Sequence, residues 1–174
     1  MTDSPHSDLE FVVFDTEWGW LNVVRSPRGL VSLSFPRTTA DEAMAELGAV
    51  AKTGRQVTDF GGFKKKLRDY FAGKRTVFDE ALDLTAATPF RRKVWLATQG
   101  IPYGEGQSYA WVADRLGNPK ACRAVGQALG KNPLPIIVPC HRVLTSDGAL
   151  GGFSGGLETK RRLLKLEGIA CLNL

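Results

Sequence analysis

The sequence predicts an α/β protein with a small N-terminal α+β domain, residues 1–87, and a mostly helical C-terminal domain, residues 88–174. The chain has 174 residues, of which 43% are hydrophobic and 24% are charged. It is therefore long and apolar enough to bury one ordinary core or two small ones. The division rests on a change of pattern near residue 88, where short β-favouring runs give way to helical periodicity.

The N-terminal domain is predicted to contain antiparallel strands at 11–14, 18–24 and 29–35, because these β-favouring runs alternate and are bounded by Gly and Pro. Residues 25–29 form the turn between the last two strands. Helices are predicted at 40–49 and 62–72. In the second helix Phe63, Leu67 and Phe71 keep helical spacing, and Gly73 ends it.

The C-terminal domain is predicted to begin with a helix that Thr88 caps and that ends before Gly100. A turn at 101–106 follows, and then helices at 108–116 and 120–131, joined by three residues. Two short helices in this arrangement are typical of a helix-turn-helix, the DNA-reading motif, but also of ordinary helix pairs in a protein core.

The second helix of this pair has a polar face and several small residues. Arg123 and Gln127 lie four apart, so both can point outward. Ala124 and Gly126 leave the backbone without bulky side chains. Close approach to a duplex would use this property, and so would tight packing between helices.

Cys140 is the candidate reactive residue. A buried strand is predicted at 136–138, and Pro139 ends it, so Cys140 would follow a rigid element. His141 and Arg142 come next and supply a potential base and a cation, and either could favour the nucleophilic thiolate. The alternative is that Cys140 is a small buried apolar residue, as most intracellular cysteines are.

Two further segments complete the candidate site. Five glycines between residues 148 and 156 predict either a pocket wall for a flat ligand or an ordinary surface loop. A last helix is predicted at 157–167. Its final turn holds Glu167, where the helix dipole disfavours an anion. A cationic partner such as His141, or exposure to solvent, would account for this placement.

Composition excludes several classes of protein. No apolar run approaches the ~20 residues that span a bilayer, and the polar N-terminus is not typical of a secretory signal. Three cysteines, Cys122, Cys140 and Cys171, indicate a reducing compartment, the cytoplasm, and the last of these, like Cys122, is expected to be inert. Their spacing gives no pair suited to a metal, so no metal or cofactor is expected.

The motif Pro139-Cys-His-Arg-Val143 resembles the active-site signature of the O6-alkylguanine-DNA alkyltransferases (methylated-DNA–protein-cysteine methyltransferases). The likeness covers about residues 88–168. It includes the segments 101–105, 108–109, 117–120, 123–126, 132–133, 154–156 and 167–168, in the family's order and spacing. Two positions depart from the family: Phe153 replaces a frequent tyrosine, and Cys122 replaces a common alanine.

The resemblance implies irreversible, single-turnover DNA repair. Cys140 would accept the alkyl group from O6 of a flipped guanine, and from O4 of thymine, in duplex DNA. His141 would act as base through a water, Glu167 would orient it, Asn132 would hold the site, and Tyr109 would assist the leaving base. Arg123 would fill the stack that the base vacates. The other expected DNA contacts are Tyr109, Ala124, Gly126 and Gln127, and the expected pocket residues are Pro135, Val143, Phe153, Ser154 and Gly155. The expected partner is double-stranded DNA and the expected state is a monomer.

Two other functions remain compatible with the sequence. The first is a DNA-binding regulator that alkylation or oxidation of a cysteine modulates. The second is a Cys–His hydrolase, which would turn over and would need an oxyanion hole.

Overall fold

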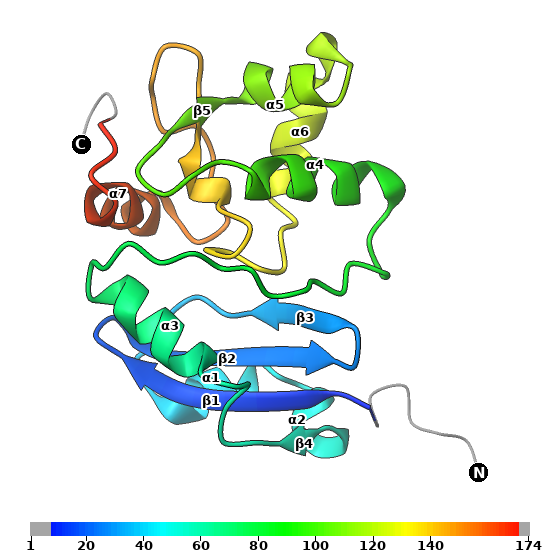
Figure 1. Ribbon diagram of the computed structural model, residues 1–174, viewed down its shortest axis with the longest axis vertical. Helices are drawn as coiled ribbons and strands as arrows, with labels where there is room; N and C mark the ends of the chain where they lie inside the picture. The colour runs from blue at the N-terminus through cyan, green and yellow to red at the C-terminus, as the bar shows by residue number, and fades with distance from the viewer. Residues whose placement is uncertain (1–7, 171–174) are drawn as a thin grey trace. The chain divides into compact units, whose positions relative to one another are not determined.

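The computed structural model describes residues 8–170, so the expectations for the N-terminal segment and for Cys171 lie outside the described residues. The chain divides into two compact units, Met1–Leu84 and Thr85–Leu174. A sheet dominates the first unit and helices dominate the second (Figure 1), which confirms the predicted fold class. The division follows Leu84, whereas the change of sequence pattern placed it after residue 87.

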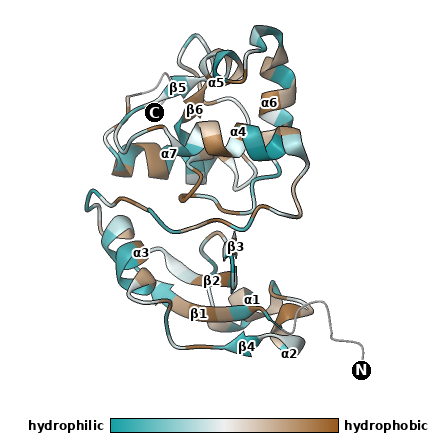
Figure 2. Ribbon diagram, turned by 45° about the vertical axis from the view of Figure 1, so that its right-hand side comes forward, coloured by the Kyte–Doolittle hydropathy of each residue, from teal (hydrophilic) through white to brown (hydrophobic). Residues whose placement is uncertain are grey.

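The N-terminal unit is built on a four-stranded sheet. Its strands are β1 (Glu10–Thr16), β2 (Gly19–Ser26), β3 (Gly29–Leu33) and β4 (Arg55–Gln56), in the order β3-β2-β1-β4. The first three strands pair antiparallel, as predicted, and the short β4 joins β1 in parallel. In Figure 2, β1 is largely in the apolar colour. This agrees with its strongly buried residues and indicates that both faces of the sheet are covered.

Helices lie on both faces of this sheet (Figure 1). On one face Phe11 and Val24 pack with Leu47, which follows helix α1 (Ala40–Ala45) and precedes helix α2 (Val50–Thr53). Helix α3 (Phe63–Phe71) covers the other face, to which the alternation of β1 turns Phe14. There the ammonium of Lys64 lies 5.8 Å from the centre of the Phe14 ring.

The predicted helix at 40–49 is wrong in its extent. Helix α1 ends at Ala45, and Gly48 adopts a left-handed conformation with φ 54°. An α-helix requires negative φ throughout, so the chain turns there and starts again as α2. The segment predicted as one helix therefore contains α1, a turn and the approach to α2.

The C-terminal unit begins with helix α4 (Pro89–Gln99), which Thr88 caps by accepting a hydrogen bond from the Arg91 amide. Helix α5 (Tyr109–Arg115) follows, capped by Ser108. The 3-10 turn η1 (Pro119–Ala121) then leads into helix α6 (Cys122–Leu129). The indole of Trp95 donates to the Ala128 carbonyl at 2.9 Å and thereby ties α4 to α6.

The remaining elements position the reactive segment. The 3-10 turn η2 (Cys140–Arg142) runs directly into strand β6 (Val143–Leu144), which pairs in parallel with β5 (Gln107–Ser108). The chain then forms a loop to helix α7 (Leu157–Leu166), which has one buried face and carries both colours in Figure 2. None of the helices within residues 8–170 is long and apolar enough to cross a membrane.

The strand predicted at 136–138 is wrong. Residues 136–138 are buried, as expected, but they form a tight turn in which the Val138 amide donates to the Leu134 carbonyl at 2.8 Å. Ile136 has a φ of 75°, which is rare for a β-branched residue. Prolines on both sides of the run remove ladder donors, so its apolar character reflects burial and not strand pairing.

Candidate active site

Cys140 begins the 3-10 turn η2, and its side chain lies at the centre of the site. Only 4% of the residue is exposed. Its amide donates to the Val138 carbonyl at 2.7 Å, which fixes the backbone that carries the sulfur. The tight turn at 136–138 therefore does the positioning that the sequence analysis assigned to a strand.

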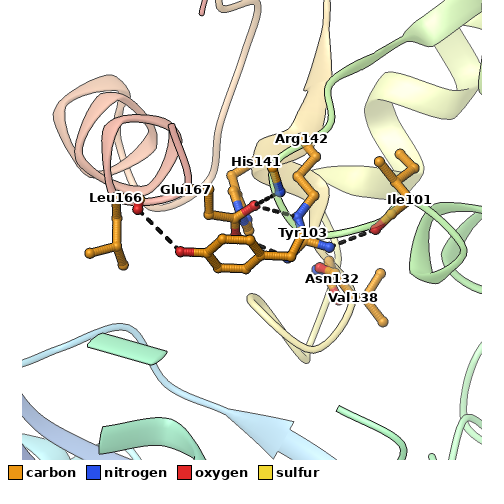
Figure 3. Close-up of polar contacts among 9 residues, drawn as sticks. Ile101, Tyr103, Asn132, Val138, His141, Arg142, Leu166 and Glu167 are labelled. Carbon is orange, nitrogen blue, oxygen red and sulfur yellow. Dashed lines mark hydrogen bonds and ion pairs between the residues drawn. The ribbon is translucent and has the colours of Figure 1, made fainter. Parts of the chain in front are cut away.

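Asn132, three residues after the end of α6, stabilises this arrangement. Its Nδ2 donates to the Val138 carbonyl at 2.8 Å and to Sγ of Cys140 at 3.1 Å, and its Oδ1 accepts from the Leu134 amide at 3.0 Å. Figure 3 shows Asn132 beside Val138. The amide thus supports the turn and supplies a hydrogen bond to the sulfur.

Glu167 brings His141 and Arg142 together (Figure 3). Nε2 of His141 lies 2.8 Å from Oε1 of Glu167. Arg142 binds the same carboxylate through two atoms, with Nε donating to Oε2 at 2.7 Å and Nη2 donating to Oε1 at 3.0 Å. Glu167 is therefore buried beside a cation, Arg142, and hydrogen-bonded to the imidazole, so exposure to solvent does not explain its placement.

Backbone groups complete the surroundings of the carboxylate. Glu167 is the C-cap residue of α7, and its Oε2 also accepts from the Gly104 amide at 3.2 Å. Nη1 of Arg142 donates to the Ile101 carbonyl at 2.6 Å, and the Tyr103 hydroxyl donates to the Leu166 carbonyl at 3.2 Å. The turn before β5 is thereby attached to both the reactive segment and the end of α7.

Burial sets the protonation of the three central groups. Burial raises the pKa of the Cys140 thiol, although the Asn132 hydrogen bond opposes this effect. Burial also lowers the pKa of His141, against the pull of Glu167. For Glu167, burial acts to raise the pKa, but the hydrogen bonds from His141 and Arg142 outweigh it and bring the pKa to about 2. The resting site thus holds a thiol, a neutral imidazole and a carboxylate.

A cavity of about 630 Å³ opens beside the sulfur. This volume lies in the range of small-molecule sites, ~300–1,000 Å³. Its walls come from α5, α6 and the loop after β6. The lining residues are Tyr109, Ala110, Cys122, Arg123, Gly126, Leu129, Gly130, Cys140, Thr145, Ser146, Gly151, Gly152, Phe153 and Ser154. The glycine-rich loop is therefore a wall of this cavity.

Tyr109 lies between α6 and the loop. Its hydroxyl donates to the Gly152 carbonyl at 3.4 Å, and burial, together with the neighbouring Cys140, raises its pKa. Gly151 has a φ of 64°, and a Cβ atom there would lie 2.8 Å from the Tyr109 hydroxyl oxygen. Only glycine fits this contact without a shift, so the loop and the tyrosine are matched in shape.

Helix α6 presents one face to its own unit and another outward. Val125 and Leu129 are buried, while Arg123, Ala124 and Gln127 are exposed. Gly126 is half-buried, and a Cβ atom there would lie 3.6 Å from the Tyr109 ring. The small residues of this helix thus serve helix packing at Gly126 and leave an open face around Arg123.

Three of the expected pocket residues lie elsewhere. Pro135, Val143 and Gly155 are not among the residues that line the cavity, whereas Phe153 and Ser154 are. Pro135 forms an isolated bridge with Val138. Val143 is fully buried in β6, and its carbonyl accepts from Lys160 at 2.6 Å. Within residues 8–170, no cluster of His, Cys, Asp and Glu side chains is arranged to hold a metal ion.

Two residues of the site were missed by the sequence analysis. Arg142 was considered as a cation near the thiol, and not as a partner of Glu167. Lys160 was not considered at all, yet it is fully buried and its ammonium binds the carbonyls of Val143 in β6 and of Leu150 in the loop after it. Its spacing from Leu164 and Glu167 on one face of α7 is the signal that could have revealed it.

Comparisons with known proteins point to one family. Residues 11–84 match the family model described as 6-O-methylguanine DNA methyltransferase, ribonuclease-like domain, and residues 89–169 match its DNA binding domain. A methylated-DNA–protein-cysteine methyltransferase of Mycolicibacterium paratuberculosis is 45% identical over 83% of this chain and 89% of that protein. Its counterpart in Mycobacterium bovis is 53% identical over 62% of this chain and 65% of that protein.

Solved structures share the fold. A crystal structure of Mycobacterium tuberculosis O6-methylguanine methyltransferase has a TM-score of 0.75 and 39% identity, and covers 92% of this chain and 93% of that one. A crystal structure of the M. tuberculosis protein in complex with DNA has a TM-score of 0.74 and 39% identity, covering 91% and 92%. Two family models that together match most of the chain, and a relative aligned over most of its length, lead to one conclusion: the chain belongs to the 6-O-methylguanine DNA methyltransferase family.

Proposed function

We propose that the protein repairs alkylated DNA by transferring the alkyl group from O6 of guanine, or from O4 of thymine, to Sγ of Cys140. The observation that carries this proposal is the position of Cys140, which lines a cavity of about 630 Å³ and directly precedes a buried His141 that is bound to Glu167. The names of the relatives, and a crystal structure of one of them with DNA, support the same reaction.

The first step is removal of the thiol proton. A neutral imidazole is the form that accepts a proton, and burial keeps His141 in that form. Since Nε2 faces Glu167, the proton passes through a water to Nδ1. Glu167 is an anion and stabilises the imidazolium that results. Asn132 donates its hydrogen bond to the sulfur that becomes charged.

The thiolate then attacks the alkyl carbon. A sulfur–carbon bond forms as the carbon–oxygen bond to the base breaks, and the base leaves with the electron pair of that bond. Tyr109 lines the cavity and its pKa is raised, so its hydroxyl keeps a proton that it can donate to the leaving base. The imidazolium of His141 then returns its proton through water to the Tyr109 oxygen, so that overall the thiol proton replaces the alkyl group on the base. The thioether has no good leaving group, so each molecule reacts once.

A duplex hides the alkylated oxygen, so the nucleotide must leave the stack. Helices α5 and α6 form the proposed helix-turn-helix, with Ala124, Gly126 and Gln127 facing the DNA. Arg123 is exposed on α6 and also lines the cavity. It is therefore suited to fill the gap that the flipped base leaves and to offset a few kcal/mol of unstacking.

Phe153 and Ser154 contact the flipped base inside the cavity. Pro135, Val143 and Gly155 do not line the cavity, so no contact with the base is proposed for them. The protein works as a monomer on double-stranded DNA, in the cytoplasm, where its thiol stays reduced.

The test is the intact mass of the protein after incubation with a duplex that contains one O6-methylguanine. Each wild-type molecule is expected to gain one methyl group, without turnover, and Cys140→Ala is expected to gain none. Cys122→Ala is the matched control, because Cys122 also lines the cavity, and it should react like the wild type. Methylation of the Cys140→Ala protein would contradict the assignment.

The same measurement separates the two alternatives. Repeated release of product from one protein molecule would favour a Cys–His hydrolase. Tight binding of the damaged duplex with no change in mass would favour a regulator. No structural observation within residues 8–170 favours either alternative over alkyl transfer.

A further inference from the structure

Arg142 is a buried cation directed toward α7. It is 6% exposed, and its side chain donates hydrogen bonds to the two carboxylate oxygens of Glu167 and to the Ile101 carbonyl. Figure 3 shows the guanidinium between Glu167 and Ile101. The guanidinium carbon Cζ also lies 5.8 Å from the centre of the Tyr103 ring. These contacts connect the guanidinium to the carboxylate of Glu167 and to the turn at 101–106.

Without a cationic partner, the position of the Glu167 carboxylate would be electrostatically unfavourable. Glu167 caps the C-terminal end of α7, where the helix dipole disfavours an anion, and its side chain has no exposed surface. A buried anion needs a cation, and two candidates touch it: the guanidinium of Arg142 and the imidazole of His141. Only the first is permanently charged. A bidentate guanidinium therefore neutralises Glu167 without requiring a proton on His141.

We propose that Arg142 is a positioning residue, which neutralises and orients Glu167 so that the His141 imidazole stays uncharged and able to accept the thiol proton. The proposal rests on the proposed function, because it assigns Arg142 a part in the same proton transfer. It differs from a direct effect of the cation on the thiol, since the guanidinium binds the carboxylate.

The titratable groups around His141 agree with this assignment. Glu167 and Lys160 approach it from α7, and Arg142 and the Cys140 thiol flank it in η2. Burial lowers the pKa of His141 most, Glu167 raises it, and Arg142 and Lys160 lower it. Without the guanidinium, the negative charge of Glu167 would no longer be neutralised by Arg142 and would stabilise a protonated His141 more strongly. The imidazole would then hold a proton at a higher pH.

The test is the titration of His141 in Arg142→Gln. The chain has two histidines, so a His6→Gln background leaves one imidazole whose NMR signals can be followed. In that background Arg142→Gln is expected to raise the titration midpoint of His141 by about one pH unit or more, which is about tenfold in proton affinity. The double variant Arg142→Gln/Glu167→Gln is expected to return the midpoint to the wild-type value or below it.

The second readout is the rate of reaction with free O6-benzylguanine as a function of pH. Arg142→Gln is expected to shift the acidic limb of this profile to higher pH by the same amount as the His141 midpoint. Arg142→Lys keeps the positive charge but cannot donate two parallel hydrogen bonds to the carboxylate, so it should give a smaller shift. Arg92→Gln, at an exposed position on α4, is the matched control and should leave the profile unchanged.

Two results would overturn the proposal. One is a His141 midpoint that stays in place in Arg142→Gln while the rate falls equally at all pH values, since this is what a purely structural role produces. The other is a midpoint that stays high in the double variant. The titration needs no DNA, so it reports on Arg142 even if the wild-type protein takes up no methyl group and the proposed function fails.

Discussion

At the scale of single residues, the reactive sulfur depends on polar groups that compensate for its burial. A thiolate at Cys140 would lose most of its hydration, and burial accordingly raises the thiol pKa. Asn132 is the group that opposes this effect most directly, with Nδ2 at 3.1 Å from Sγ. Cys140 is thus a thiol in the resting protein, and its ionisation to the nucleophilic thiolate depends on this amide and on His141.

Asn132→Asp tests the amide without changing its shape. The variant replaces the donor with a carboxylate oxygen, so it removes a hydrogen bond to the sulfur and places a negative charge beside it. A lost hydrogen bond to a charged group costs about 1.5–3 kcal/mol, so the reaction with free O6-benzylguanine should slow by about 10-fold to 100-fold at neutral pH. The loss should shrink at alkaline pH, where the thiol ionises without help.

Asn118→Asp is the control for this experiment. Asn118 is exposed in the turn between α5 and α6, so the same change there should leave the rate with the free base intact. An Asn132→Asp protein that reacts as fast as the wild type would remove the amide from the mechanism.

The contacts of the site were only partly predictable at this scale. The motif 139–143 identified Cys140 and His141, and the helix dipole argument left two explanations for Glu167, a cationic partner or exposure to solvent. The pair of hydrogen bonds from Arg142 to Glu167 was not predictable. The directions of consecutive side chains here depend on the 3-10 turn η2, where the sequence analysis expected the end of a strand.

At the scale of elements, α6 serves the cavity and the outer surface at once. Leu129 and Gly126 line the cavity, while Arg123, at the start of the helix, both lines it and is exposed. A substitution at Arg123 can therefore separate the handling of DNA from the chemistry at Cys140.

Arg123→Ala is expected to weaken binding to a duplex with O6-methylguanine and to slow its repair. The reaction with free O6-benzylguanine should stay within about twofold of the wild type, because a free base needs no extrusion from a stack. Both rates are measured by methyl or benzyl uptake in single-turnover assays. Gln127→Ala, one turn further on the same face, serves as a milder comparison. Equal loss on both substrates would refute the role of Arg123 in the stack.

Elements were predictable where periodicity and caps agreed, as in α4 and α5, whose capping residues Thr88 and Ser108 accept the hydrogen bonds expected of them. The turn at 136–138 was not predictable, because a run of apolar residues indicates burial but does not show whether the segment pairs with a strand. The short strands β5 and β6 have two residues each, too few for an alternating pattern.

At the scale of the whole molecule, the chain forms two units that each have a core of their own. The change of pattern near residue 88 reflects this, since sheets and helix bundles bury residues at different spacings. The buried acidic and basic side chains of residues 8–170, in contrast, lie in the C-terminal unit, at His141, Arg142, Lys160 and Glu167. This unit should therefore respond most strongly to acid.

The direction of this response follows from two pKa shifts. The pKa of Glu167 falls from its ordinary value of 4.5 to about 2 on folding, so its contribution to stability is complete above pH 4.5 and is lost as the pH falls toward 2. The pKa of His141 lies below its ordinary value of 6.5, so the unfolded chain takes up this proton first and stability also declines below pH 6.5. Both groups weaken the unit in acid.

Glu167→Gln should make this unit less stable at neutral pH and less sensitive to acid. The shift of Glu167 corresponds to about 3 kcal/mol of the free energy of unfolding, so the difference between wild type and variant should shrink by about this amount between about pH 6 and about pH 2. Urea denaturation followed by fluorescence measures it. In a Trp18→Phe/Trp20→Phe background, the emission comes from Trp95 and Trp111 of the C-terminal unit alone. Glu105→Gln, at an exposed position, should follow the wild-type curve, and parallel curves for wild type and Glu167→Gln would contradict the expected coupling.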